Sequence, residues 1–132
     1  IGVPHHQKWM NGGKFDGGQL TENEKALRNY YSEVLNFTRN SSALMGEYLE
    51  LHSFNRSQNP AYTNKTFAFA RWDESQKLIV VTNFDEFKSV KTTLKLSPEL
   101  LKAWNLKAGE REIKELMFGK KKTKLRVTDT GA

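Results

Sequence analysis

Residues 66–86 read TFAFARWDESQKLIVVTNFDE, and this stretch decides the fold class of the chain. β-branched and aromatic residues fill 66–72 and 78–84, and a polar turn at 73–75 separates them, which predicts an antiparallel β-hairpin. Neither strand alternates between apolar and polar residues. Because successive side chains of a strand point to opposite faces, both faces of this hairpin need a cover. We therefore expect the hairpin to be central, with another layer on each side.

The composition is that of one globular domain. The chain has 132 residues, of which 37% are hydrophobic and 11% aromatic, and this length supports a core without cross-links. It contains no cysteine, which excludes disulfides and cysteine-based zinc sites and leaves the compartment open. No run approaches the roughly 20 apolar residues of a membrane span. The polar segment 1–10 does not resemble a signal peptide. A first residue other than Met indicates a start inside a longer protein, with tag removal or processing as the alternative.

The net charge of +6 comes entirely from the C-terminal part of the chain. Residues 1–85 hold nine Lys/Arg and nine Asp/Glu, whereas residues 86–132 hold twelve and six. Such a basic half can indicate nucleic acid or another anionic partner. However, Lys124 and Arg126 alternate with apolar residues, as Lys91 and Lys95 do, which is typical of the outward positions of half-buried strands. We expect solvated strand faces and no nucleic-acid partner, with an anionic-partner patch as the alternative.

Local signals predict a helix and then a series of strands. Residues 1–20, with two glycine pairs, predict an irregular Gly-rich lead-in. Thr21 and Glu24 form a capping box, and apolar residues at helical spacing predict an α-helix over 21–40. The segment 41–132 predicts strands at 48–54 and 89–96, a polar loop at 55–65, a short helical turn opened by Ser97-Pro98-Glu99, and a last hairpin at 112–118 and 123–127. The predicted fold is mainly β: an antiparallel Greek-key β-sandwich preceded by one N-terminal α-helix.

No arrangement of residues predicts an active site. The adjacent histidines at 5–6 point apart in an extended chain, and the only other histidine is His52. The segment 11–18, NGGKFDGG, lacks the GK[ST] ending and the preceding strand of a phosphate loop. The carboxylate pairs at 73–74 and 85–86 are explained by turns. With no cysteine and no Gly-x-Ser-x-Gly motif, the sequence predicts no catalytic residue, no metal site and no cofactor.

Three stretches match one family pattern in their order and spacing. The first is a helix with aromatic, apolar and arginine positions before a small-residue turn: Tyr30, Tyr31, Val34, Leu35, Arg39, Ser42, Ala43, Leu44 and Gly46. The second is a hairpin that reads FAFAR at 67–71, LIVV at 78–81 and NF at 83–84. The third is the lead-in KFDGGQLT at 14–21. Together they resemble the C-terminal end of the α-amylase family, glycoside hydrolase family 13, over residues 14 to about 96.

This resemblance implies an accessory role. Family members hydrolyse or transfer α-glucosidic bonds in starch-like glucans, using three carboxylates of a catalytic barrel that lie upstream of its last helix. The motifs of those carboxylates are absent from this chain, so no catalytic residue carries over. The resemblance implies that 21–40 is the last barrel helix and that 41–132 is the C-terminal β-sandwich domain, whose partner is the catalytic barrel of the same parent protein. It also implies that a closing strand is missing after residue 132.

Two functions remain open. The first is a non-catalytic accessory domain of an α-amylase-family glycosidase, which stabilises the barrel. The second is an autonomous binding module, for α-glucan polysaccharide through exposed aromatic residues or for an anionic partner through the basic half. Tyr62 and Trp104 are the candidate sugar-contacting residues, with Tyr48 and Trp72 as further candidates, and a core or loop-anchoring role is the alternative for each. Because an uncovered apolar helix favours association, the isolated chain is also expected to self-associate.

Overall fold

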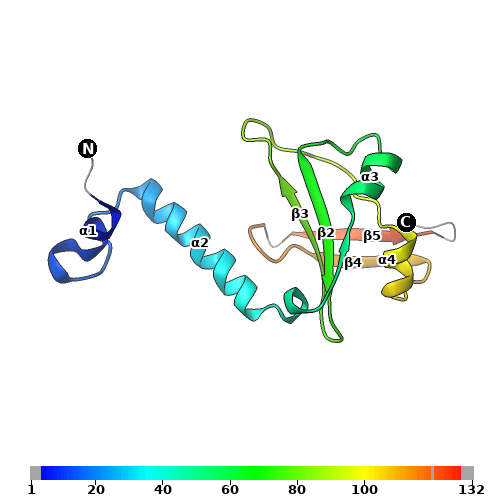
Figure 1. Ribbon diagram of the computed structural model, residues 1–132, viewed down its shortest axis with the longest axis horizontal. Helices are drawn as coiled ribbons and strands as arrows, with labels where there is room; N and C mark the ends of the chain where they lie inside the picture. Colours follow the sequence, from blue (N-terminus) through cyan, green and yellow to red (C-terminus); the bar gives the residue numbers. More distant parts are fainter. Residues whose placement is uncertain (1–3, 120, 129–132) are drawn as a thin grey trace. The chain divides into compact units, whose positions relative to one another are not determined.

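A computed structural model describes residues 4–119 and 121–128 (Figure 1). The chain divides into two compact units, with the boundary between Asn40 and Ser41, and each unit is described by itself. The first unit contains α1 (His5–Met10), η1 (Asn11–Gly13) and α2 (Glu22–Asn40). The second unit contains η2 (Ser42–Met45), β1 (Glu47–Glu50), α3 (His52–Gln58), β2 (Thr66–Trp72), β3 (Lys77–Asn83), α4 (Pro98–Ala103), β4 (Gly109–Lys114) and β5 (Lys122–Val127).

Residues 5–13 form α1 and η1, so the irregular lead-in predicted over 1–20 is wrong for these residues. α1 is capped by Asn11, which has a left-handed backbone (φ 41°) and donates its amide to the Gln7 carbonyl. The chain then returns to Trp9. The Gly17 amide donates to the Trp9 carbonyl over 3.0 Å, and a Cβ at Gly17 would overlap the indole ring. Gly17 is required here because it packs closely on the Trp9 ring.

Helix α2 confirms the predicted helix and its capping box. The Thr21 amide donates to Glu24 Oε2 over 2.8 Å, and the Glu24 amide donates to Thr21 Oγ1 over 3.3 Å. Lys8 Nζ lies 2.7 Å from Glu24 Oε1, and this bond, followed by those from Thr21, holds the pKa of Glu24 at about 2. The Arg28 guanidinium lies 3.9 Å from the centre of the Trp9 ring. These contacts fix the lead-in to the start of α2, whose own residues are all solvent-accessible or half-buried.

The second unit contains two small antiparallel sheets. In the first sheet β2 lies between β1 and β3, as expected for a central hairpin strand, and Leu49 faces Ala70 while Phe69 faces Val80. The second sheet consists of β4 and β5. The described residues therefore form a mixed α/β fold, where the sequence predicted a mainly β fold, and the Greek-key sandwich is not confirmed. The hairpin at the middle of the first sheet is confirmed to within one residue at each end.

The hydrophobic core of the second unit joins both sheets and α4. Its fully buried members include Leu51 and Leu100. The core cluster as a whole consists of Leu51, Tyr62, Ala68, Ala70, Leu96, Leu100, Leu101, Trp104 and Val127. β2 contributes Ala68 and Ala70, which are both completely buried. One face of the central strand is therefore covered; the sequence predicted a layer on both faces, and Phe67 and Phe69 on the second face are only half-buried.

Helix α3 replaces the second half of the predicted strand 48–54 and the start of the predicted loop 55–65. The last bond of this strand to β2 runs from the Leu51 amide to the Ala68 carbonyl, over 2.9 Å. The Glu50 carboxylate then accepts from the Ser53 amide over 2.5 Å, which satisfies a free donor of the first helical turn. The Asn55 amide then donates to the Leu51 carbonyl over 3.1 Å, which closes the first turn of α3. The predicted boundary was wrong by about one turn.

The predicted strand 89–96 is also wrong, because side chains occupy its backbone hydrogen bonds. Asn55 Nδ2 donates to the Lys95 carbonyl over 2.8 Å, and the Lys95 amide donates back to Asn55 Oδ1 over 2.9 Å. Asn59 Nδ2 donates to the Thr93 carbonyl over 2.5 Å. Two asparagines of α3 and its C-cap thus bind this segment as a neighbouring strand would. The alternation of the sequence remains visible, since Leu94 is half-buried and Leu96 is buried.

The elements after residue 96 agree with their local signals. Ser97 Oγ accepts from the Leu100 amide over 3.3 Å and Pro98 follows at the first helical position, which confirms the predicted cap of α4. The last hairpin is confirmed, but β4 ends at Lys114 and not near 118. Residues after Glu115 turn instead, because the Glu115 carboxylate accepts from the amides of Met117 and Phe118 over 2.9 and 2.6 Å.

Candidate functional site

The two residues predicted to contact sugar are part of the core. Tyr62 is 7% and Trp104 9% exposed. Tyr62 Oη lies 3.2 Å from His52 Nδ1, and burial raises the pKa of the Tyr62 hydroxyl. The Trp104 ring packs edge-on against Trp72, with their centres 6.0 Å apart. A sugar platform needs a ring face open to solvent, and neither residue presents one. Their burial favours the alternative, a core or loop-anchoring role.

The face of the first sheet that points away from the core carries an aromatic row. The register puts Tyr48 opposite Arg71 and Phe69 opposite Val80, on the face away from Ala70. Ring centres lie 5.6 Å apart in the pair Tyr48–Phe69, 6.0 Å in Phe67–Phe69 and 5.4 Å in His52–Phe67. Tyr48 is 50% exposed, and the others are half-buried. We call Tyr48, His52, Phe67 and Phe69 the aromatic face.

Arg71 links the aromatic face to the turn that opens the second unit. Its guanidinium lies 5.9 Å from the centre of the Tyr48 ring. It donates to the carbonyl of Ala43 over 3.5 Å, to that of Gly46 over 3.1 Å and to that of Leu44. A Cβ at Gly46 would overlap the Trp72 carbonyl, so only glycine allows this close approach of η2 to β2. One charged side chain thus binds three carbonyls in and directly after the η2 turn.

The turn between β2 and β3 also forms hydrogen bonds with the η2 turn. The Ala43 amide donates to Gln76 Oε1 over 3.1 Å, and the hydroxyls of Ser42 and Ser75 lie 3.1 Å apart. Asp73 Oδ1 accepts from the amides of Ser75 and Gln76 over 2.8 and 2.7 Å. The carboxylate that the sequence explained by turn chemistry does have that role. It also helps to fix the start of the second unit.

The lowered pKa of Asp73 predicts that the second unit loses stability in acid. A hydrogen bond from Ser42, then bonds from Ser75 and Gln76, hold the pKa of Asp73 at about 2. This lies below the ordinary aspartate value of about 4, so the stabilisation is complete above about pH 4 and is lost as the pH falls toward 2. We expect the Asp73 carboxyl carbon to titrate with a midpoint near pH 2 in NMR spectra. In Asp73→Asn, the urea midpoint should fall less with acid than in wild type, and equal declines would contradict this assignment.

In the first unit, α2 carries a line of exposed apolar side chains. Leu27, Tyr31 and Leu35 follow at four-residue spacing and therefore lie on one side of the helix. They are 57%, 57% and 64% exposed. Tyr30, which is 48% exposed, packs edge-on against Tyr31 with their ring centres 5.8 Å apart. The apolar stripe predicted from the sequence exists, and solvent reaches it.

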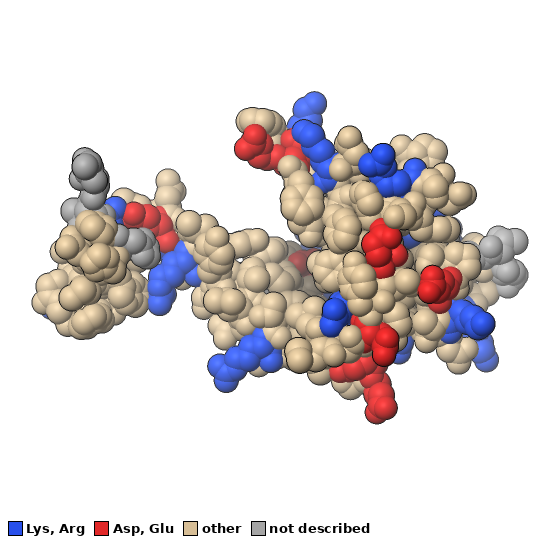
Figure 2. Space-filling model, viewed as in Figure 1, with Lys and Arg blue, Asp and Glu red and all other residues tan. Residues whose placement is uncertain are grey.

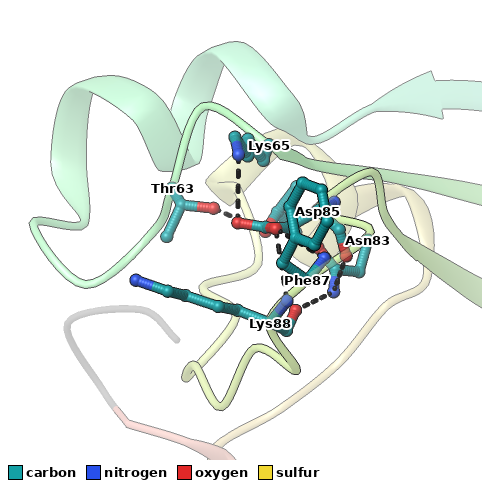
Figure 3. Close-up of polar contacts among 7 residues, drawn as sticks. Thr63, Lys65, Asn83, Asp85, Phe87 and Lys88 are labelled. Atoms are coloured by element: carbon teal, nitrogen blue, oxygen red, sulfur yellow. Dashed lines mark hydrogen bonds and ion pairs between the residues drawn. The ribbon is translucent and has the colours of Figure 1, made fainter.

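The loop after β3 holds the most exposed rings of the second unit. Phe84 and Phe87 are 70% and 84% exposed. Between them the Asp85 carboxylate accepts from the amides of Phe87 and Lys88 over 3.0 and 3.2 Å. Its other oxygen lies 3.1 Å from Lys65 Nζ (Figure 3). These bonds lower the pKa of Asp85, with the Phe87 amide as the largest cause. The sequence placed Phe84 at a strand end and did not single out Phe87.

Charges on the surface are mixed in sign. Figure 2 shows basic and acidic side chains interspersed over the displayed face. Across β4 and β5, Glu110 lies 2.8 Å from Arg126 and 3.4 Å from Lys124, and Glu112 lies 3.0 Å from Lys122. Exposed pairs of this kind contribute little stability. They do reduce the positive charge of the basic half, and Lys124 and Arg126 point outward as the alternation predicted.

Within residues 4–119 and 121–128, no three His, Cys, Asp or Glu side chains are grouped so that they could hold a metal ion. Over the same part of the chain, no helix has the length and apolar character needed to cross a membrane. Comparison with protein-family models, with curated proteins and with solved structures finds no match. The surfaces described above are therefore the basis for a functional proposal.

Proposed function

We propose that this chain is a non-catalytic accessory domain of an α-amylase-family glycosidase that acts on α-glucans, and that it stabilises the catalytic barrel of the same parent protein. In this proposal α2 is the last helix of the barrel, and the two sheets belong to an antiparallel Greek-key β-sandwich. The sequence resemblance supplies the family. The observation that carries the role is the exposed line Leu27, Tyr31 and Leu35 on α2, because a helix with such a line requires a partner.

Energetics support a partner for α2. Burial of one large apolar side chain is worth about 1.5–3 kcal/mol, so covering three of them favours association by several kcal/mol before the entropic costs are subtracted. A barrel whose outer helices pack side by side would provide such a cover. The aromatic face, with Tyr48 half-exposed, is a second apolar surface that a partner of this kind would cover. The aromatic face also carries charge, since Arg71 lies opposite Tyr48 and Glu50 lies opposite Phe69, so the apolar line of α2 is the stronger support for a permanent contact.

The contacts that hold the η2 turn against the central hairpin support the same role. Arg71, Gly46 and the Asp73 turn fix the first residues of the second unit to its central hairpin. A domain that stabilises a barrel from its C-terminal end must resist movement where the chain enters it. The hydrogen bonds of Arg71 to three carbonyls of this turn, those of Ala43, Leu44 and Gly46, meet this requirement. No catalytic step is assigned to the chain, and its proposed contribution is to stability.

The exposed side of α2 predicts self-association when the barrel is absent. We expect the isolated chain to form dimers or larger species at high micromolar concentration and to increase the fluorescence of a hydrophobic dye. The double variant Leu27→Glu/Leu35→Glu should be monomeric and should bind less dye, since two charges then interrupt the apolar line. Sedimentation equilibrium and dye titration measure both effects.

A matched control separates apolar burial from added charge. Asn23→Glu/Asn29→Glu adds the same charge at exposed polar positions of α2 and should associate like the wild type. A wild-type chain that stays monomeric and binds no dye at high concentration would contradict an unpartnered apolar surface, and with it the observation that supports the proposed role.

A further inference from the structure

β3 is an outer strand, and one side of its backbone is open. It lies at the end of the first sheet, with β2 on its inner side (Figure 1). The Phe84 amide bonds the Lys65 carbonyl, so every second residue back from Phe84 bonds β2, and the residues between them point their backbone groups outward. The outward groups belong to Lys77, Ile79, Val81 and Asn83. In the part of the chain that the structure describes, none of these backbone amides and carbonyls forms a hydrogen bond.

Charged side chains protect the other described strands of the second unit from pairing with another chain, but they do not protect β3. Natural edge strands commonly use charge for this purpose. β1 begins and ends with glutamate, and at least half of the residues of β4 and of β5 are charged. Of the seven residues of β3, only Lys77 at its start is charged, and 78–81 read LIVV. An uncharged edge rich in β-branched residues favours pairing with another extended strand.

The side chains beside this open edge are apolar and only partly covered. The register sets Val81 opposite Ala68, and Ile79, two residues earlier, lies on the same core face of the sheet. Val81 is nevertheless 51% exposed, and Ile79 is half-buried against the core. A strand added beside β3 would cover both side chains. Apolar burial would then add to the backbone hydrogen bonds of the new pair.

The sequence of β3 is complementary to itself in the antiparallel direction. Pairing of two copies about Val80 sets Ile79 of one copy opposite Val81 of the other, which brings apolar side chains together. The same register sets Lys77 opposite Asn83, so no like charges face each other. All the outward amides and carbonyls of β3 then exchange hydrogen bonds with the other copy. Any other register that keeps this pattern leaves one outward residue beyond the end of the partner strand.

We propose that β3 is a self-association surface, on which two copies of the chain pair antiparallel about Val80 and join their first sheets into one. The outer edges of the joined sheet then belong to β1 and carry its glutamates. Association stops at the dimer, because a two-fold contact of this kind closes on itself. A contact of one strand per copy is smaller than the roughly 1,200 Å² of stable interfaces, so we expect a transient dimer with a dissociation constant of about 1 mM. This inference does not rest on the proposed function.

The test is amide hydrogen exchange, measured by NMR at increasing concentration of the Leu27→Glu/Leu35→Glu variant, in which association through α2 is removed. At about 3 mM, two-thirds of the chains should be paired, so the outward amides of Ile79 and Val81 should exchange about threefold more slowly than in dilute solution. The Val80 amide, which already bonds β2, should change little. Sedimentation equilibrium over the same concentrations should show monomer and dimer and no larger species.

A lysine on the open edge should prevent the pairing. Val81→Lys, made in the same variant, places an ammonium group opposite Ile79 of the other copy and should remove the dependence of exchange on concentration. Because half of the Val81 side chain is exposed, circular dichroism should show an unchanged fold. Thr123→Lys is the matched control. It adds the same charge at an exposed position of β5 and should pair like the variant from which it is made.

The exchange pattern decides the inference even without the lysine variants. Exchange at Ile79 and Val81 that does not depend on concentration would overturn it, and so would equal slowing at Val80. Pairing of Val81→Lys to the same extent as Thr123→Lys would also overturn it. Growth into species larger than a dimer would do the same, since it indicates open-ended strand addition. Each of these results leaves the accessory role standing, because that role is tested through α2 of the wild type at micromolar concentration.

Discussion

Asn55→Ala should lower the free energy of unfolding of the second unit by about 2–4 kcal/mol. Asn55 is completely buried, and its amide group bonds the Leu51 and Lys95 carbonyls over 2.9 and 2.8 Å. Its oxygen accepts from the Lys95 amide and from Asn59 Nδ2 over 2.9 and 3.1 Å. Alanine leaves these groups without partners and also leaves a cavity. Urea denaturation followed by circular dichroism measures the loss.

Asn55→Ala should also loosen the segment 89–96, because that segment loses the hydrogen bonds of Asn55 to Lys95. Hydrogen exchange at the Lys95 amide should accelerate more than exchange within β2, because Asn55 Oδ1 is the acceptor of that amide. Asn64→Ala is the matched control, since Asn64 is exposed, and it should change stability by less than about 0.5 kcal/mol. If Asn55→Ala proved as stable as Asn64→Ala, Asn55 would not be the residue that holds this segment.

Arg71→Met should cost about 2–3 kcal/mol, chiefly by loosening the η2 turn. Methionine keeps much of the apolar stem but removes the donors that bind the carbonyls of Ala43, Leu44 and Gly46. Because the guanidinium reaches several acceptors from one plane, Arg71→Lys should recover only part of the loss. Urea denaturation gives the magnitude.

Arg56→Met provides the comparison for Arg71, because Arg56 is an exposed residue of α3. Its loss should change the stability by less than about 0.5 kcal/mol. Full recovery in Arg71→Lys would mean that charge alone matters at this position. No loss in Arg71→Met would mean that the turn carbonyls are equally well satisfied by water.

Elements with local signals could be predicted from the sequence. The hairpin 66–86, the capping box at Thr21 and the Ser97 cap each depend on residues a few positions apart, and the structure contains all three. The segment 89–96 was predicted wrongly because its hydrogen-bond partners are side chains of Asn55 and Asn59, roughly forty residues earlier. A distant asparagine that replaces a strand leaves no trace in local periodicity.

The candidate site was less predictable than the fold. Residue type alone suggested Tyr62 and Trp104 as sugar contacts, but exposure depends on where the chain folds back, and both are buried. Phe87 is exposed because the hydrogen bonds of Asp85 determine the turn around it, a tertiary detail that composition does not reveal. Arg71 did carry a signal. A single charged residue inside an apolar strand requires partners, and here it has three carbonyl acceptors.

The sequence of the coding region upstream of Ile1 tests the central claim most directly. If the chain is the accessory domain of an α-amylase-family glycosidase, the same reading frame should encode alternating strands and helices of a barrel, with an aspartate, a glutamate and a second aspartate at the ends of its strands. A start codon directly before this segment, or an upstream domain that lacks those carboxylates, would contradict the account.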